Sequence, residues 1–260
     1  MLLFNLQKWY LDCVTDSGEA AILYWAILRW GVFRLRYGAA LHRSRTGETV
    51  EGYTLRPGSP PQLSGGAGLQ WCSETLGVEG FWSPRESGFE RTLLDSAAGQ
   101  IHWHCVSPRA DAEVRLGNRK LCGMGYAEHL TMTLKPWQLP FEQLRWGRFH
   151  SASEAMVWIE WCGSTECSWV FVNGEELGRA RTTARCVESP DDGVHLSIDT
   201  GSTLRAGRLV NTALRSVRGL VSLMPTWRMA RETKWLARGE LETPAGVSSG
   251  WVVHEEVRWA

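Results

Sequence analysis

Short apolar stretches recur along the whole chain, and Gly, Pro, Asn or Asp residues separate each stretch from the next. The stretches are rich in β-branched and aromatic residues, a pattern that is typical of strands and turns in an antiparallel β protein. They are too many for a single small sandwich. The predicted strands are Trp9–Val14, Ala21–Trp30, Val32–Tyr37, Val50–Leu55, Leu69–Glu74, Gly80–Trp82, Arg91–Leu94, Gln100–Val106, Glu113–Leu116, Gly125–Leu134, Leu144–His150, Ala155–Trp161, Ser168–Val172, Arg185–Glu188, Val194–Ile198, Lys234–Leu241 and Gly250–Trp259.

Three segments carry other local signals. Asn173 and Gly174 both tolerate the positive φ of a type I′ turn, so they predict a hairpin. Between residues 204 and 224 the apolar residues change to helical spacing, which predicts one helix near residues 207–224. The Pro/Gly/Ser stretch Arg56–Gly68 could be a domain linker, but we interpret it as a long loop.

A faint internal repeat divides the chain near its middle. The segment EAAILYWAILRW from Glu19 resembles EAMVWIEW from Glu154, about 135 residues further on. In addition, LRWG occurs at residues 28–31 and again at residues 144–147. Repeats of this kind indicate duplicated structural units. The sequence therefore predicts two β domains, residues 1–140 and residues 141–260.

The composition argues against several classes of protein. Lys plus Arg equals Asp plus Glu at 28 each, so no net field draws the chain to nucleic acid or to an anionic membrane. No apolar run reaches the roughly 18 residues of a membrane span, and the N-terminal segment does not resemble a signal peptide, so we expect a cytoplasmic protein. The seven cysteines are scattered without a C-x-x-C pair, which indicates free thiols in a reducing compartment.

Tryptophan is the unusually frequent residue, with 15 spread through the chain. Such large rigid rings either fill a thick β core or wall an apolar ligand pocket, because each buries roughly 150–250 Å². We expect most of them in the core and the remainder around a pocket. No G-x-S-x-G motif, phosphate-binding loop or dinucleotide fingerprint is present, so we expect no cofactor.

The predicted strand Gly125–Leu134 carries ionisable side chains among aromatic residues. Because side chains alternate along a strand, Tyr126 and Glu128 share one face and His129 lies on the other. A carboxylate walled by aromatic rings has its charged form disfavoured, which raises the pKa of the group. Glu128 is therefore a candidate general acid.

The predicted strand Leu144–His150 shows the same mixture. Trp146, Arg148 and His150 share one of its faces. If this strand and the preceding one line a single concavity, Glu128 lies near Trp146, and the guanidinium of Arg148 lowers the pKa of the carboxyl. The alternative is a solvated ion pair between Glu128 and Arg148 across adjacent strands at the rim of a barrel.

Three motifs give the chain a resemblance to a known family. They are GY-x-[acid]-H at Gly125–His129, WGR at Trp146–Arg148 and GQIHWHCVSPRADAEV at Gly99–Val114. The chain resembles the hydroxyneurosporene synthase (carotenoid 1,2-hydratase) or AttH-like group of lipocalin relatives, and is similar to tocopherol cyclases and lipocalin-like Diels–Alderases. The resemblance spans residues 99–161 and continues more faintly through Glu232–Arg238. It implies an all-β fold of two lipocalin-like antiparallel β-barrel or sheet domains packed together, with an apolar cavity in or between them.

In the hydratases, the acid of the GY-x-D-H-N-W-G stretch is the proposed proton donor to an isolated alkene. The resemblance carries this role to Glu128 and places the adjoining histidine of the group at His129. This chain departs from the pattern because its acid is Glu and because Leu130 and Thr131 replace Asn and Trp. The resemblance therefore does not carry the substrate across.

His102 and His104 form an H-x-H pair on a predicted strand, a spacing that is used in zinc and iron sites. With His129 or Glu128 as a third ligand, a metal centre could be built. The resemblance matches Gly99, Ile101, Trp103 and Cys105 and does not match these histidines. We expect no bound metal and assign His104 to the lining of the pocket.

The sequence predicts a cofactor-independent enzyme that hydrates, isomerises or cyclises an apolar unsaturated small molecule of terpenoid, carotenoid or polyketide type. Glu128 is the expected proton donor, His129 a proton relay and Arg148 a ligand for a substrate oxygen. The alternatives are a non-catalytic carrier of a lipophilic ligand and a scaffold with a filled interior. The residues expected to line a Trp-rich pocket are Tyr126, Trp103, Trp146, Trp158, His150 and His104.

Overall fold

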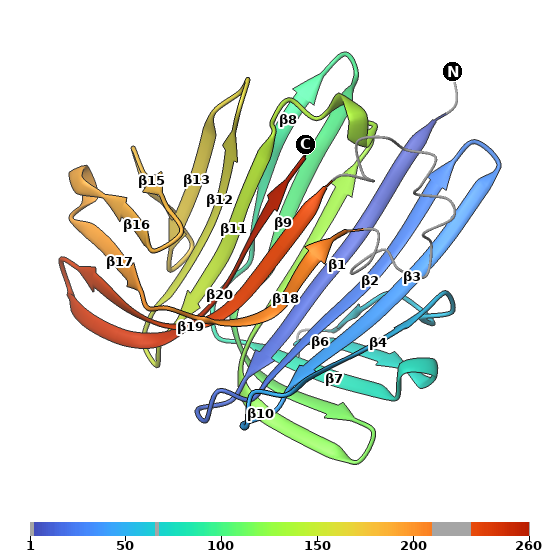
Figure 1. Cartoon of the computed structure of the whole chain (residues 1–260), viewed down its shortest axis with the longest axis horizontal. Coiled ribbons are helices and arrows are strands. Elements are labelled where there is room, and N and C mark those ends of the chain that lie inside the picture. The colour runs from blue at the N-terminus through green and yellow to red at the C-terminus, as the bar shows by residue number, and fades with distance from the viewer. Residues whose placement is uncertain (1–2, 66–67, 210–229, 260) are drawn as a thin grey trace. The chain divides into compact units, whose positions relative to one another are not determined.

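The computed structural model describes residues 3–65, 68–209 and 230–259 (Figure 1). Within these residues the regular structure is twenty β-strands and three short 3₁₀ helices, which confirms the predicted all-β class. This part of the chain has no helix of the length and apolar character that a membrane crossing requires. The predicted helix near residues 207–224 falls almost entirely outside the described residues, and residues 207 and 208 belong to a strand.

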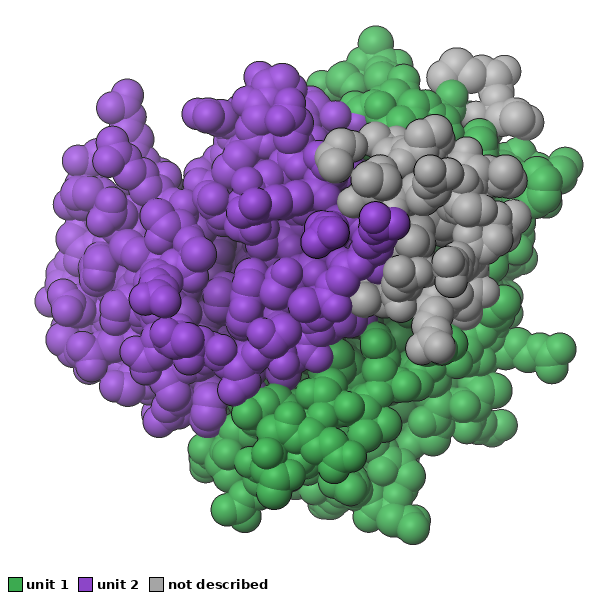
Figure 2. Space-filling view, in the orientation of Figure 1, with its two compact units in different colours: residues 1–138 green, residues 139–260 purple. Residues whose placement is uncertain are grey.

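The chain divides into two compact units, Met1–Gln138 and Leu139–Ala260, which Figure 2 colours separately. The division lies two residues before the boundary predicted from the sequence. The first unit contains β1 (Phe4–Val14), β2 (Ala20–Trp30), β3 (Phe33–Arg43), β4 (Thr49–Thr54), β5 (Gln62–Ser64), β6 (Gly68–Ser73), η1 (Glu74–Leu76), β7 (Val78–Pro84), β8 (Phe89–Ser96), β9 (Gly99–Leu116), β10 (Arg119–Met132) and η2 (Pro136–Gln138). The second contains β11 (Gln143–His150), β12 (Ala155–Cys162), β13 (Cys167–Val172), β14 (Glu175–Glu176), β15 (Arg181–Thr182), β16 (Cys186–Ser189), η3 (Pro190–Asp192), β17 (Val194–Ile198), β18 (Ser202–Arg208), β19 (Arg231–Thr243) and β20 (Gly246–Arg258).

Each unit holds one ten-stranded antiparallel sheet, and the two sheets have the same topology. The first has the order β4-β3-β2-β1-β10-β9-β7-β6-β5, with β8 beside β9. The second has the order β14-β13-β12-β11-β20-β19-β17-β16-β15, with β18 beside β19. The repeated segments that start at Glu19 and Glu154 form the equivalent strands β2 and β12. The two LRWG copies fall instead on β2 and β11, which are not equivalent, so this part of the sequence match is fortuitous.

One face of each sheet packs tryptophan rings directly onto glycines. In the first unit, a Cβ at Gly80 would lie 2.4 Å from Cη2 of Trp82, and one at Gly125 would lie 2.6 Å from Cδ1 of the same ring. In the second unit, a Cβ at Gly147 would lie 2.1 Å from Cζ2 of Trp158. Glycine therefore supplies the space in which each indole ring lies against the backbone. Both rings belong to the apolar cores.

Strand β9 is a single strand, although the sequence analysis predicted two strands at this place. The two predicted strands, Gln100–Val106 and Glu113–Leu116, left out the segment that contains Pro108, a residue that cannot donate a ladder hydrogen bond. In the structure, Cys105 pairs with β8 and Ala110 pairs with β7, so the proline lies where β9 changes its neighbour. The register with β10 also shifts here, beside Gly125 and Ala127. The hydrogen-bond ladders of β9 are already interrupted at this point, so the missing N–H of Pro108 removes no hydrogen bond from a continuous ladder.

Other local predictions hold. Asn173 and Gly174 have φ angles of 51° and 85°, and they connect β13 to β14 as the hairpin signal predicted. The stretch Arg56–Gly68 is a connection inside the first unit and includes the short strand β5. It is not a domain linker.

The substitution Gly147→Ala should lower the free energy of unfolding by about 1–3 kcal/mol, because the added methyl overlaps the Trp158 ring and forces the core to shift. Gly178→Ala is the matched control in the same unit, since its nearest neighbour, Oδ2 of Asp192, would lie 3.5 Å from the new Cβ. Denaturant unfolding of the two variants measures the difference. Equal midpoints would contradict the proposed packing of Trp158.

Candidate active site

The sheet of the first unit buries both of its faces near β1 and β10. One face carries the apolar core, which includes Leu11 and Ala127. On the opposite face, Tyr10 lies directly across from Glu128, and Asp12 lies across from Tyr126. All four side chains on this face are buried. We call these four residues, together with Trp103, the acid cluster.

The Glu128 carboxyl accepts hydrogen bonds from two neutral donors. Trp103 on β9 donates its Nε1–H to Oε2 at 2.7 Å, and the Tyr126 hydroxyl donates to the same oxygen at 2.8 Å. Glu128 is only 7% exposed, and both donors are buried. Burial, followed by the charges of Cys105 and Glu128, raises the pKa of Tyr126 well above its usual value. The phenol is therefore protonated at neutral pH and acts as a donor.

A second buried carboxylate completes the acid cluster. The Tyr10 hydroxyl donates to Oδ2 of Asp12 at 3.0 Å, and Asp12 is fully buried. The Tyr10 ring also contacts the Tyr126 ring edge-on, with 6.0 Å between the centroids. Two carboxyl groups and two tyrosine hydroxyls thus share one aromatic face. Groups of these types can donate and accept protons.

His129 and His104 lie on the face opposite to Glu128. His129 stacks on Trp9 with 4.7 Å between the ring centroids, and it pairs in register with His104. His104 and His102 both lie near Glu90, at 3.8 Å and 3.5 Å. Burial is the main reason why the pKa values of His129 and His104 are lowered. The structure therefore does not bring these imidazoles to the acid cluster.

Arg148, Trp146 and His150 lie on β11, in the sheet of the second unit. The alternative of an ion pair between Glu128 and Arg148 across adjacent strands is wrong. Strand β10 pairs with β1 and β9, whereas β11 pairs with β12 and β20. The guanidinium of Arg148 is buried, and its Nη1 donates to the carbonyl oxygen of Trp251 at 3.1 Å.

Trp158 and Trp146 lie on opposite faces of the second sheet. Trp158 pairs with Gly147 and belongs to the apolar core, whereas Trp146 pairs with Ile159 on the other face. These two rings therefore do not wall a common pocket within this unit. Trp103, which the sequence analysis assigned to the lining of the pocket, lies on the face of Glu128 and donates a hydrogen bond to its carboxyl.

The duplicated topology gives Glu128 a counterpart in the second unit. Tyr10, Glu128 and Cys105 form a cross-strand row on β1, β10 and β9. The equivalent row on β11, β20 and β19 is Trp146, Glu255 and Lys234. Lys234 forms an ion pair with Glu255, and its Nζ lies 5.2 Å from the centroid of the Trp146 ring. In the second unit this sheet position holds Glu255, whose carboxylate lies beside the ammonium group of Lys234. In the first unit it holds Glu128, whose carboxyl accepts hydrogen bonds from a phenol and an indole.

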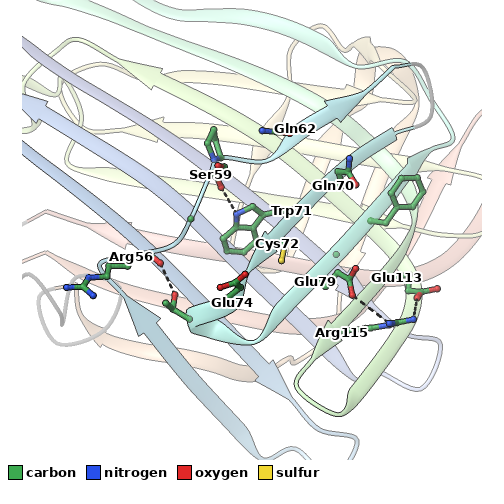
Figure 3. A pocket seen from close by; sticks show the side chains of 15 residues that line it. Arg56, Ser59, Gln62, Gln70, Trp71, Cys72, Glu74, Glu79, Glu113 and Arg115 are labelled. Atoms are coloured by element: carbon green, nitrogen blue, oxygen red, sulfur yellow. Dashed lines mark hydrogen bonds and ion pairs between the residues drawn. The ribbon is translucent and has the colours of Figure 1, made fainter.

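A cavity of about 590 Å³ lies elsewhere in the first unit, where residues of β6, β7 and β9 line it (Figure 3). The segment from Arg56 to Gln62 forms one wall, where Trp71 Nε1–H donates to the Ser59 carbonyl at 3.1 Å. Arg115 on the opposite wall contacts the carboxylates of Glu79 and Glu113 (Figure 3). Of the site residues predicted from the sequence, all of them described, none lines this cavity. It is therefore not the expected Trp-lined apolar pocket.

Sequence reasoning did not identify Asp12, Tyr10, Glu255 or Lys234. The signal for Asp12 was its place as the charged residue in the apolar run Trp9–Val14, but which face of the sheet it occupies depends on the register with β10. The signal for Glu255 was its equivalence to Glu128 in the duplicated topology. Both signals require the strand order, which the sequence alone does not supply.

Comparison with known proteins identifies the fold. No protein-family profile matches the sequence, and no curated protein matches it. Kievitone hydratase from Nectria haematococca is similar in structure, with a TM-score of 0.56, 12% identity and coverage of 98% of this chain and 89% of the hydratase. A putative AttH from Nitrosomonas europaea has a TM-score of 0.59 and 8% identity over 98% of this chain and 92% of that chain. CghA with Sch210972 has a TM-score of 0.58 and 10% identity over 99% and 89%.

At these identities the likeness concerns the fold alone. It confirms the structural resemblance to the AttH-like lipocalin relatives that the motifs in residues 99–161 predicted. This fold is one that a hydratase also adopts.

His254 gives the second unit a testable pH dependence. Its ring stacks on Trp235, and burial, followed by the charge of Lys234, lowers the pKa of His254 to about 4. The unfolded state takes up this proton near the ordinary value of 6.5, so it binds more protons than the folded state between these values. Stability should therefore fall as the pH falls through this window, by about 3 kcal/mol in total.

The substitution His254→Phe should keep the ring stack and remove the titration. Denaturant unfolding at a series of pH values should show a shallower loss of stability in this variant than in the wild type. Parallel curves for the two proteins would contradict a neutral, buried His254.

Proposed function

We propose that the chain is a cofactor-independent enzyme that transfers a proton from Glu128 to an apolar, unsaturated small molecule. The observation that carries the proposal is the acid cluster: a buried carboxyl bound by Tyr126 and Trp103, with the Asp12 carboxylate on the same face. Acid-catalysed hydration, isomerisation and cyclisation of an alkene begin with such a proton transfer. A hydratase with the same fold supports this reaction class.

Tyr126 and Trp103 both donate to Oε2 of Glu128, so a proton carried on Oε1 could leave without the loss of either hydrogen bond. Transfer of this proton to an alkene carbon forms a C–H bond and leaves a carbocation next to it. The electron-rich faces of Tyr126 and Trp103 stabilise such a cation, because the face of an aromatic ring attracts positive charge.

The second step decides the product. In hydration, a water oxygen bonds to the cation, and its surplus proton returns to the Glu128 carboxylate, which restores the catalyst. In isomerisation, a neighbouring carbon of the cation loses a proton to the Glu128 carboxylate, and a new C=C bond forms. In cyclisation, a second alkene of the substrate attacks the cation, and the new cation then loses a proton to the same carboxylate. Asp12, through its hydrogen bond from Tyr10, is a second proton acceptor on the same face.

Arg148 and its neighbours receive a structural role in this proposal. The buried guanidinium of Arg148 donates to the backbone carbonyl of Trp251, and a second buried arginine of this unit, Arg205, forms an ion pair with Glu232 at 2.5 Å. His129 receives no proton-relay role, since it lies on the opposite face of β10.

The substitution Glu128→Gln should lower turnover by about 100-fold or more, because a general acid contributes at least that factor. The amide keeps the shape of the side chain, and its oxygen still accepts the hydrogen bonds from Tyr126 and Trp103. Glu113→Gln is the control, since Glu113 is an exposed partner of Lys120. The assay incubates the protein in D₂O with a panel of isoprenoid, polyene and polyketide alkenes and detects deuterated products by mass spectrometry.

Two outcomes would overturn the assignment. Equal deuterium incorporation by the wild type and Glu128→Gln would remove Glu128 from the reaction. Tight binding of a lipophile by both proteins, without conversion by either, would establish the carrier alternative instead.

A further inference from the structure

A group of three metal-ligating side chains lies in the second unit, on the strands β16 and β17. Cys186 and Glu188 are two positions apart on β16 and share a face, and His195 on β17 lies directly across from Glu188. The Cys186 Sγ lies 3.7 Å from Nδ1 of His195, which in turn lies 4.0 Å from Oε2 of Glu188. Among the described residues, this is the group in which three such ligand atoms lie within 4.8 Å of one another.

These separations are close to those of a tetrahedral zinc site. Zinc bonds of about 2.3 Å to sulfur and about 2.0 Å to nitrogen and oxygen give ligand separations of about 3.5 Å for S···N and about 3.3 Å for N···O. Small side-chain rotations close the remaining gap. Thiolate, imidazole and carboxylate are also the three ligand types that zinc accepts. Three protein ligands leave the fourth position open.

The backbone around the group is already fixed. A single turn, η3, joins the two strands, and Gly193 adopts the left-handed conformation with a φ of 64° that ends it. Asp192 accepts a hydrogen bond from the backbone N–H of Gly178 at 2.9 Å and binds the hydroxyl of Ser189 at 2.5 Å. The three ligands therefore project from a hairpin whose backbone is held by a turn and by hydrogen bonds. A bound metal ion would have to order only the side chains.

The surroundings allow a cation to enter. The side chains of His195 and Glu188 are 45% and 39% exposed, and Cys186 is partly buried. Glu242 on β19 lies across from His195 and adds a negative charge, whereas Arg181 on β15 lies across from Glu188 and opposes it. The neighbouring charges of Glu242 and Arg181 thus cancel. The net negative charge at the site comes from its own ligands, the carboxylate of Glu188 and the thiolate of Cys186.

We propose that Cys186, Glu188 and His195 bind Zn²⁺, with an open fourth position that faces solvent. The site belongs to the second unit and is separate from the acid cluster of the first. Bound zinc would link β16 to β17 close to the edge of the sheet at β15. The proposal does not depend on the proposed enzymatic function.

Cobalt substitution tests the proposal. Titration of the full-length, reduced and metal-free protein with Co²⁺ should produce a thiolate-to-cobalt charge-transfer band and the visible bands of tetrahedral cobalt, and added Zn²⁺ should bleach both. Cys186→Ser should abolish the charge-transfer band. His195→Gln should weaken binding by about tenfold or more, since even the loss of an outer-shell partner costs 10–100-fold.

Cys167→Ser is the matched control, because Cys167 is a partly buried free cysteine in the same unit. This variant should bind cobalt like the wild type. Two results would overturn the proposal. In the first, the wild-type protein shows no charge-transfer band. In the second, the band persists in Cys186→Ser, which would place the metal on another cysteine. Circular dichroism confirms the fold of each variant, and His195→Gln decides the question if Cys186→Ser does not fold.

Discussion

The central strands of each sheet bury both of their faces, and this constraint governs the rest of the structure. A strand sends alternate side chains to opposite faces, so a single strand must satisfy two different environments. On one face, Trp82 and Trp158 lie against glycines and fill an apolar core. On the other face, polar and charged side chains are buried and require partners, because an unpaired buried charge is costly. Glu128 is buried on this face, and Glu255, whose side chain is 11% exposed, holds the equivalent position in the second unit.

The two units meet the same demand with different chemistry. Glu255 has an ammonium partner in Lys234, and the surrounding charges also form pairs, as Arg205 and Glu232 do. Glu128 is bound by the phenol of Tyr126 and the indole of Trp103. Since the strand order is identical, the difference arises from the side chains and not from the fold. The duplicated architecture therefore provides an internal comparison between a carboxylate that contacts an ammonium group and a carboxyl that accepts hydrogen bonds from a phenol and an indole.

Local features of the structure could be predicted from the sequence, whereas the pairing of distant strands could not. The hairpin at Asn173 and the face of Glu128 follow from turn preference and from the two-residue period of a strand. The neighbour of β10 does not follow from any local pattern, because β1 joins it from the far end of the unit. For the same reason Asp12 was missed, and Arg148 was wrongly considered for an adjacent strand. The continuity of β9 through Pro108 does not follow from any local pattern either, because it depends on the change of neighbour from β8 to β7.

The nature of the hydrogen-bond donors explains why the proton chemistry is assigned to the first unit. A carboxylate beside an ammonium group is held in its charged form, because protonation gives up the ion pair. A carboxyl bound by a phenol and an indole keeps both hydrogen bonds in either protonation state, since Oε2 can accept them as a carboxylate oxygen or as the carbonyl oxygen of the acid. Proton release from Glu128 therefore requires no rearrangement of Tyr126 or Trp103. An acid that must give up a proton and recover it in each turnover needs a setting of this kind, and within the described residues the Lys234–Glu255 pair, at the equivalent position, does not provide it.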